Sequence, residues 1–234
     1  MIWPSTNQIG RLQLEVTNYC NAKCLQCERA HLVDIKSQGD DAWEGTRDFD
    51  LDLNTTYIPL ELFEKRFKKG EWDHLEYVHF CGNVDEPVIH PDIIPIIKHF
   101  QKVVPTRNQL VDVSVNGGVR DEAFWTELGQ LSARSNQLRV IWGIDGLEDT
   151  NHMYRVGVRW AVLERNFRAY IKAGGHAIWQ FIVFDWNKHQ IKLAKKLCEK
   201  EGFSKFVIMQ SVRGDDPEEI TDDIIPDDYD RARN

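Results

Sequence analysis

The chain has 234 residues, of which 42% are hydrophobic, so it can bury one substantial core, and its length suits a single α/β domain. Its net charge of −8 argues against a phosphate-backbone binder, which needs a basic stripe, so we expect no nucleic-acid partner. No run approaches the roughly 20 consecutive apolar residues that span a bilayer, and residues 1–5 lack the features of a secretory signal. We therefore expect a cytoplasmic protein that does not bind a membrane.

Apolar, strand-like runs alternate along the chain with amphipathic segments. The apolar runs predict six strands, at residues 12–16, 75–80, 110–115, 139–144, 177–184 and 206–209. Apolar faces at helical spacing, with Pro, Asp or Gly at their ends, predict five helices, at residues 59–67, 93–100, 121–131, 160–171 and 191–198. This alternation predicts an α/β fold with a parallel sheet, either open or curled like part of a barrel. Ligands of such folds gather at the carboxyl ends of the strands.

Two segments fall outside this alternation. Residues 28–58 are polar and acidic and are too long for an ordinary loop, which indicates a lid or a substrate loop. Residues 215–230 hold nine carboxylates and no Lys or Arg, which is more typical of a solvated tail than of a specific partner site. We therefore expect a core domain at residues 1–210, with an insertion at 28–58, and an acidic C-terminal tail at 211–234.

Three of the five cysteines lie within eight residues, a pattern typical of a metal site and not of a disulfide framework. Cys20, Cys24 and Cys27 directly follow the first predicted strand. Thiolates bind iron–sulfur clusters, and a cubane usually takes four of them. Three thiolates leave one iron open to a further ligand, so we expect these cysteines to hold a 4Fe-4S cluster.

Other interpretations of the cysteines remain open. His31 follows at a spacing that permits a zinc site with three Cys and one His, as in a zinc-stabilised binding module. An electron-transfer cluster would need a fourth cysteine, for which Cys81 and Cys198 are candidates. Cys198 lies on an apolar helical face and is expected in the core. For Cys81, near the predicted cluster, a redox or radical-relay role competes with simple packing.

The spacing of Cys20, Cys24 and Cys27 resembles the CxxxCxxC motif of the radical S-adenosylmethionine (SAM) superfamily. Residues 14–19, LEVTNY, resemble the first strand of its peptide- and protein-modifying branch, and the resemblance extends over residues 11–210. It implies a partial (β/α)6 barrel that binds a 4Fe-4S cluster and SAM at the carboxyl ends of its strands. It also implies an enzyme that uses an external electron donor to cleave SAM to methionine and a 5′-deoxyadenosyl radical, which abstracts hydrogen from a substrate.

Further matches to the family follow the second and third predicted strands. Residues 81–87, CGNVDEP, resemble its Gly-Gly-Glu-Pro motif, which implies that Glu86 holds the amino group of SAM, although Val84 and Asp85 replace the glycines. The next three residues, His-Pro-Asp, are interpreted as a turn and helix start. After the third strand, Asn116 is implied to approach the SAM ribose or carboxylate, although an Asn-Gly turn explains the same residues.

The fourth predicted strand ends in residues 143–146, GIDG, with Tyr-Arg following at 154–155. This is similar to the family's Ser-Ile-Asp-Gly…Tyr-Arg stretch and implies that Asp145 and Arg155 are cofactor-binding residues. Arg155 would pair with the SAM carboxylate, for which its forked donors are suited; a surface salt bridge is the alternative. Gly143 replaces the serine of the family, which removes a contact with the ribose.

Gln26 also departs from the family, in which the residue before the third cysteine is usually aromatic or apolar and packs on adenine. A glutamine can still lay its stem on the ring and hydrogen-bond to the ring edge. The resemblance leaves the substrate as a peptide, a protein or a small molecule. Many relatives carry a further cysteine-rich domain, but no cysteine follows Cys198, so we do not expect auxiliary clusters. A protein that binds SAM and a cluster without turnover is a further alternative.

Overall fold

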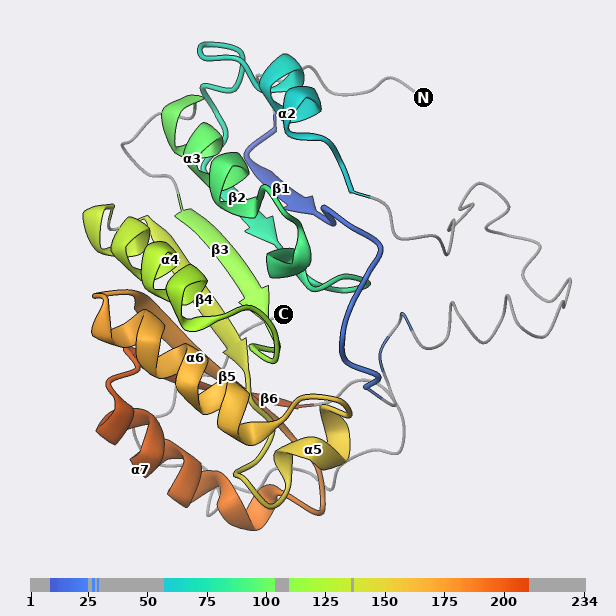
Figure 1. Cartoon of the computed structure of the whole chain (residues 1–234), viewed down its shortest axis with the longest axis vertical. Coiled ribbons are helices and arrows are strands. Elements are labelled where there is room, and N and C mark those ends of the chain that lie inside the picture. Colours follow the sequence, from blue (N-terminus) through green and yellow to red (C-terminus); the bar gives the residue numbers. More distant parts are fainter. Residues whose placement is uncertain are drawn as a thin grey trace, which may run out of the picture. The chain divides into compact units, whose positions relative to one another are not determined.

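The structure is a computed structural model, shown in Figure 1. It describes residues 9–24, 27, 29, 57–103, 110–135 and 137–210. Most of the predicted insertion at 28–58, the whole acidic tail at 211–234, Gln26 and His31 lie outside the described residues. The chain divides into two compact units. Unit 1 is Met1–Cys20 with Cys27–Ser114, and unit 2 is Asn21–Gln26 with Val115–Asn234.

Unit 1 is built on parallel strands that pair in chain order. Leu12 of the first strand is in register with Val78 of the second, which in turn is in register with Val111 of the third. The elements are β1 (Arg11–Leu14), α2 (Leu60–Arg66), β2 (Tyr77–Phe80), the 3-10 helix η2 (Pro87–Ile89), α3 (Ile93–Val103) and β3 (Leu110–Val115), whose last residue belongs to unit 2. The parallel pairing brings the carboxyl ends of β1 and β2 to the same edge.

The core of unit 1 is aliphatic and aromatic. On α3, Ile93, Ile96, Ile97 and Phe100 are fully buried, at the spacing of a single helical face. The ring of Phe100 lies 4.6 Å from that of Phe67 on the segment after α2. Burying each such side chain contributes about 1.5–3 kcal/mol, so this face fixes α3 in unit 1.

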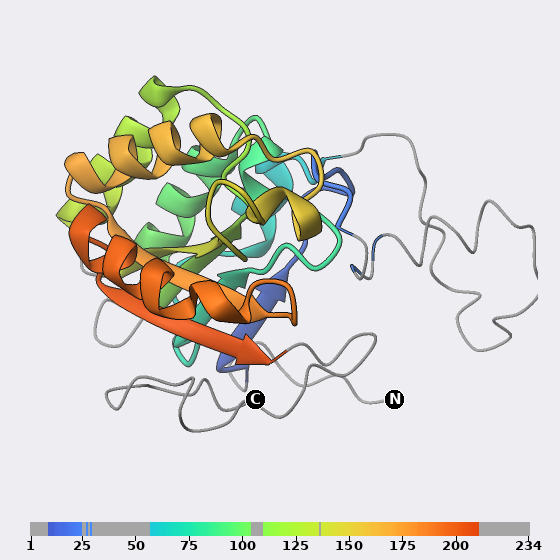
Figure 2. The ribbon, with the colours of Figure 1, turned by 90° about the horizontal axis from the view of Figure 1, so that it is seen from below.

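Unit 2 holds the other three strands and the longest helices. Its elements are α4 (Glu122–Arg134), β4 (Leu138–Gly143), α5 (Asn151–Tyr154), α6 (Trp160–Lys172), β5 (His176–Val183), the 3-10 helix η3 (Lys188–Gln190), α7 (Ile191–Glu201) and β6 (Lys205–Gln210). Strands β4, β5 and β6 pair in parallel in chain order. Helices α4 and α6 lie side by side (Figure 1), and α7 lies along β6 (Figure 2). Gly129 permits the close approach of α4 to α6, because a Cβ there would lie 2.8 Å from Ala173 Cβ.

The six predicted strands and five predicted helices are confirmed, with ends that differ by a few residues. Local signals at the helix ends are confirmed too: Asp121 caps α4 by accepting a hydrogen bond from the Phe124 amide at 2.9 Å. Gly202 ends α7 with a φ of 86°, a conformation that glycine adopts readily. The short α5 was not predicted, because four residues are too few for an apolar period to show.

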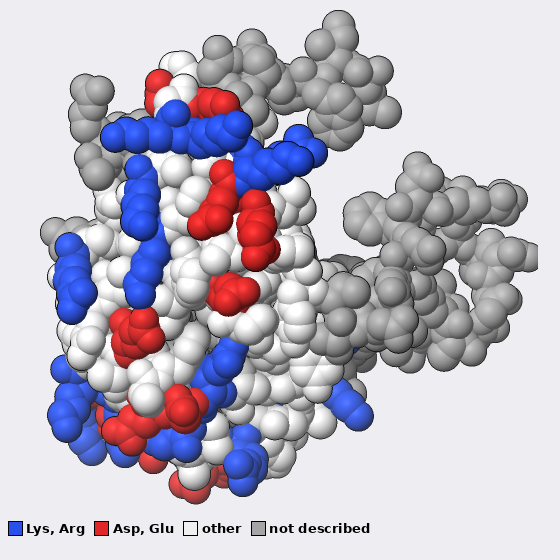
Figure 3. Space-filling view, turned by 45° about the horizontal axis from the view of Figure 1, so that its top comes forward, with Lys and Arg blue, Asp and Glu red and all other residues white. Residues whose placement is uncertain are grey.

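The surface carries charges of both signs. On the face drawn in Figure 3, Lys and Arg side chains lie between Asp and Glu side chains. None of the helices in the described part of the chain is both long enough and apolar enough to span a bilayer.

Candidate active site

The three clustered cysteines are distributed over the two units: Cys20 and Cys27 belong to unit 1, and Cys24 belongs to unit 2. None of the three is in a disulfide bond; Cys24 is buried and the other two are partly exposed. Within the described ranges, no three His, Cys, Asp or Glu side chains are gathered so as to hold a metal ion. The donor set itself fits an iron–sulfur cluster, because soft thiolates are the ligands that such clusters take. The cluster therefore stays a prediction.

In unit 1, a loop at residues 81–87 follows β2 and is held by the carboxylate of Glu15, the first residue after β1. The backbone amides of Asn83, Val84 and Asp85 donate to Glu15 at 3.0, 3.2 and 3.2 Å. Gly82 opens the loop with a φ of 62°, a turn conformation that a glycine adopts at low cost. Three successive amides around one carboxylate form an anion-binding nest, which Glu15 fills from within the protein.

Asp85 makes the reciprocal contacts. Its Oδ2 accepts hydrogen bonds from the backbone amides of Val16 at 2.8 Å and Thr17 at 3.0 Å. The side chain is 3% exposed. Burial, and after it the charge of Glu15, raises the pKa of Asp85 to about 9, so this carboxyl keeps its proton at neutral pH. From the sequence, Asp85 was expected only to replace a glycine of the family motif. Its contacts lie 68 and 69 residues away along the chain, so no local signal could have shown them.

Glu86 lies next to this connection and is 2% exposed. Its backbone amide donates to the carbonyl of Tyr19 at 2.9 Å. Pro87 then begins η2, at a position where its missing N–H is not needed. The turn predicted at residues 90–92 is confirmed: the His90 ring accepts the Asp92 amide at 3.0 Å, and α3 begins directly afterwards. The structure therefore holds a buried carboxyl group at the position that the sequence predicts for binding the SAM amino group.

The two other cysteines are buried or partly buried thiols. Burial and a hydrogen bond to Glu15 raise the pKa of Cys81 to about 12, and its Sγ donates to Glu15 at 2.7 Å. Cys81 is thus a protonated donor at neutral pH, which favours a structural role over a redox one. Cys198 is buried in the core, as predicted, and burial raises its pKa to about 12.

In unit 2, the segment that leads to Cys24 is tied to residues after β3. The carboxamides of Asn21 and Asn116 bond reciprocally at 2.9 and 3.3 Å, and Asn116 also accepts the Gly118 amide at 2.8 Å. The amide of Lys23 donates to the carbonyl of Val156 at 2.9 Å. The side chain of Asn116, which was predicted to bind the cofactor, therefore hydrogen-bonds to the segment that carries Cys24. The turn that was the alternative for Asn116 is also present, closed by the hydrogen bond from the Gly118 amide.

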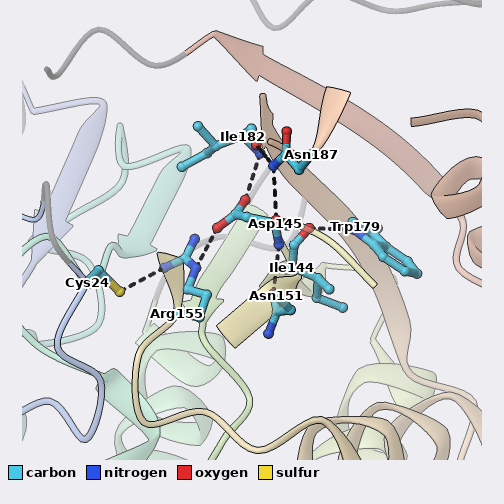
Figure 4. Close-up of polar contacts among 8 residues, drawn as sticks. All are labelled: Cys24, Ile144, Asp145, Asn151, Arg155, Trp179, Ile182 and Asn187. Carbon is cyan, nitrogen blue, oxygen red and sulfur yellow. Dashed lines mark hydrogen bonds and ion pairs between the residues drawn. The ribbon is translucent and has the colours of Figure 1, made fainter. Parts of the chain in front are cut away.

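Asp145 and Arg155 form a buried ion pair beside Cys24 (Figure 4). Arg155 Nε lies 2.6 Å from Asp145 Oδ2, and the amide of Ile182 donates to Oδ1 at 2.7 Å. Asn187 donates to the carbonyl of Asp145 at 3.0 Å. Arg155 Nη1 approaches Cys24 Sγ at 4.0 Å. Because Asp145 is 0% and Arg155 17% exposed, this is not the surface salt bridge considered as the alternative for Arg155.

Ion pairing and burial act against each other at both groups of the pair, and at Asp145 the effect of burial is the larger, so its pKa lies above the ordinary value. Burial raises the pKa of Asp145, while the charge of Arg155 and the hydrogen bond from Ile182 lower it. For Arg155, burial lowers the pKa, but the charges of Asp145 and Cys24 outweigh it and raise the pKa above its ordinary value. A cation this close to a thiol favours the thiolate, the form that binds metals.

The absence of a side chain at Gly143 leaves space for the guanidinium of Arg155. A Cβ at position 143 would lie 2.9 Å from Arg155 Cζ and closer still to Nη2. From the sequence, Gly143 was expected only to remove a contact with the ribose. The structure shows that the absence of a side chain leaves room for Arg155.

An aromatic group follows β5 in unit 2. The ring of Phe184 lies 4.7 Å from that of Tyr154 and 5.1 Å from that of Trp186, with which it is nearly parallel at 9°. No pattern in the sequence indicated this aromatic group.

Comparison with known proteins finds likeness in sequence to one curated protein and likeness in fold to solved structures. The sequence matches no protein-family model. It is 28% identical over 120 residues to the tungsten-containing aldehyde ferredoxin oxidoreductase cofactor-modifying protein of Pyrococcus furiosus, covering 51% of this chain and 27% of that protein. The solved structure of native anSMEcpe with bound AdoMet and Cp18Cys peptide has a TM-score of 0.60 at 16% identity, over 86% of this chain and 50% of that chain. The structure of SuiB of Streptococcus suis bound to the precursor peptide SuiA has a TM-score of 0.61 at 14% identity, over 86% of this chain and 39% of that chain.

The chain thus spans 27% of the curated relative and half or less of these solved chains. Likeness to solved structures at this level of identity shows the fold. The predicted partial α/β barrel, with six parallel strands alternating with helices, is confirmed.

Proposed function

We propose that this chain, which has the radical SAM fold, is a radical SAM enzyme that binds a 4Fe-4S cluster through Cys20, Cys24 and Cys27. A fold alone does not fix a function. The observation that carries the proposal is the three-cysteine motif directly after β1 in a chain with the fold of an AdoMet-bound structure. When bound and reduced by an external donor, the cluster supplies the electron that splits SAM into methionine and a 5′-deoxyadenosyl radical.

In this proposal the charged residues of each unit have separate tasks. Glu86 of unit 1 offers a buried carboxyl group that suits the ammonium group of SAM. Arg155 of unit 2 keeps its charge, favours the thiolate of Cys24 and suits the SAM carboxylate. Asp145 acts through Arg155, because its two carboxylate oxygens are occupied by Arg155 and the Ile182 amide.

Asn116 also acts indirectly in this proposal. Its carboxamide holds Asn21, and so positions the segment that carries Cys24. Gln26 remains a proposed adenine contact on the sequence argument alone.

For the substrate we propose a peptide or protein, from which hydrogen is abstracted. Two structures with the same fold, those of anSMEcpe and SuiB, hold peptides, and the first strand resembles that of peptide-modifying enzymes. The Pyrococcus relative is named for the modification of a cofactor, which makes a small cofactor molecule the second candidate.

The proposal is tested by reductive cleavage of SAM. The anaerobically reconstituted chain should release 5′-deoxyadenosine when dithionite is added, and replacing Cys20, Cys24 and Cys27 together with alanine should abolish the release. Cys198→Ala is the matched control, since this thiol lies in the core of unit 2 and should leave the release intact. Release of deoxyadenosine by the triple variant at the wild-type rate would overturn the proposal.

A further inference from the structure

The loop that carries Glu86 is bound to the end of β1 by two acidic side chains that cross each other. Glu15, after β1, accepts three amides of the loop, from Asn83 to Asp85. Asp85, in the loop, accepts the two amides that follow Glu15, those of Val16 and Thr17. Each segment therefore satisfies the backbone donors of the other, and we call this set of contacts the carboxyl brace.

The brace needs an acid or amide side chain at position 85. A glycine there would leave the buried amides of Val16 and Thr17 without their acceptor, and buried backbone donors are rarely left unpaired. The second oxygen of Asp85, Oδ1, is buried and meets no donor among the described residues. The charge of Glu15 adds to burial in raising the pKa of Asp85. A proton on Asp85 removes the repulsion between two adjacent carboxylates.

Two further side chains, those of Cys81 and Arg29, contact Glu15 or the loop. Cys81 donates its thiol hydrogen to Glu15 at 2.7 Å, so a third group shares this carboxylate. The cation at the loop, Arg29, donates to the backbone carbonyls of Val84, at 3.1 Å, and Asn18. Arg29 therefore supports the loop through a backbone carbonyl group, whereas Glu15 supports it through backbone amides.

We propose that Glu15 and Asp85 are positioning residues that hold Glu86 in place for the ammonium group of SAM. Glu86 directly follows the braced residues, and its own amide donates to Tyr19, two residues beyond the last braced amide on the β1 side. In a Gly-Gly-Glu-Pro sequence, the glycines allow the backbone to adopt the conformation that presents the glutamate. In this loop, the contacts of the brace hold the backbone in such a conformation. The inference rests on the proposed role of Glu86.

The test compares two replacements of Asp85. Asp85→Asn keeps an oxygen for the amides of Val16 and Thr17, so it should preserve the brace. Asp85→Gly restores the glycine of the family motif and removes the brace. Asp112→Asn is the matched control, because Asp112 is a buried aspartate of the same unit whose carboxylate accepts the Tyr77 hydroxyl at 3.0 Å, away from the loop.

Two readouts separate the brace from the proposed function. Hydrogen exchange of the amides of residues 16, 17 and 83–85 should be at least tenfold faster in Asp85→Gly than in wild type, Asp85→Asn or Asp112→Asn. The dissociation constant of SAM, measured by equilibrium dialysis on protein with matched iron content, should rise at least tenfold in Asp85→Gly and stay within about threefold in the other two.

Unchanged amide exchange in Asp85→Gly would overturn the brace, whether or not SAM binds. Faster exchange with unchanged SAM affinity would overturn its positioning role. A wild-type chain that binds no SAM would instead overturn the proposed function.

Discussion

The two units each bury an aspartate just beyond a strand, Asp85 after β2 and Asp145 after β4, and surround it differently. Asp145 faces a cation, Arg155, at 2.6 Å. Asp85 faces a second carboxyl group, that of Glu15. Burial raises the pKa of both, but Arg155 then opposes the rise at Asp145, whereas Glu15 adds to it at Asp85. The neighbour of a buried acid therefore either opposes the effect of burial on its pKa, as Arg155 does at Asp145, or adds to it, as Glu15 does at Asp85.

This difference matches what each unit contributes to the proposed chemistry. In unit 2 an ionised pair fixes a cation next to the thiol of Cys24. In unit 1 the carboxyl group of Asp85 and the carboxylate of Glu15 together hold the loop that carries Glu86.

The largest effect is expected from removing the cation of unit 2. Arg155→Met should lower the free energy of unfolding by about 3–5 kcal/mol, because it leaves the buried carboxylate of Asp145 without its partner. The measurement is urea unfolding of the anaerobic protein. Arg168→Met is the control, since Arg168 is half exposed and pairs with Glu164 and Glu201 on the surface; its loss should be about 1 kcal/mol or less. Equal losses in the two variants would contradict a buried, ionised pair.

The second effect is on the pH dependence of stability in unit 1. The pKa of Asp85 is raised in the folded chain, so the folded state binds the proton more tightly than the unfolded state. This contribution is fully present below the unfolded pKa and is lost as the pH rises to about 9. Relative to Asp85→Asn, which cannot titrate, the wild type should lose on the order of 1 kcal/mol per pH unit between pH 7 and 9. Unfolding curves that stay parallel for the two proteins would show that Asp85 is ionised.

A third change fills the space that holds Arg155. Gly143→Ser restores the serine of the family but should cost about 1–3 kcal/mol of stability, because its Cβ displaces the guanidinium. In the Arg155→Met background the same substitution should cost less, since the displaced group is absent. Gly10→Ser is the control, since a Cβ there makes only an ordinary contact at 3.7 Å. Equal costs of Gly143→Ser in both backgrounds would contradict the assignment of this space to Arg155.

The smallest effect is expected at Cys81. Cys81→Ser keeps a hydrogen-bond donor for Glu15, so the free energy of unfolding should stay within about 1 kcal/mol of wild type. The iron content should stay within about 10% of wild type. Calorimetry and iron analysis measure the two quantities. A loss of iron in this variant would give Cys81 the role of a cluster ligand.

Local signals predicted the fold well. The apolar spacing of α3, the Asp121 cap of α4 and the Gly202 end of α7 each involve residues within one or two helical turns, so the sequence displays them directly. The motif positions of Glu86, Asp145 and Arg155 were likewise visible as strand-end residues in a family-like order.

The contacts that define the site were not visible in the same way. Asp85 bonds to Val16 across 69 residues, and Arg155 approaches Cys24 across 131 residues. Side chains that meet only after the strands have paired leave no periodicity in the sequence. For this reason two departures from the family motif, Asp85 and Gly143, looked like losses, whereas the structure gives each of them a partner.

Metal and sulfide analysis of the anaerobically reconstituted chain tests the proposed cluster most directly. The wild type should contain about four irons and four acid-labile sulfides per chain, and the variant with alanine at Cys20, Cys24 and Cys27 should contain neither, while His31→Ala should match the wild type. Zinc without sulfide in the wild type, lost on replacing His31, would contradict the cluster and establish a zinc site instead.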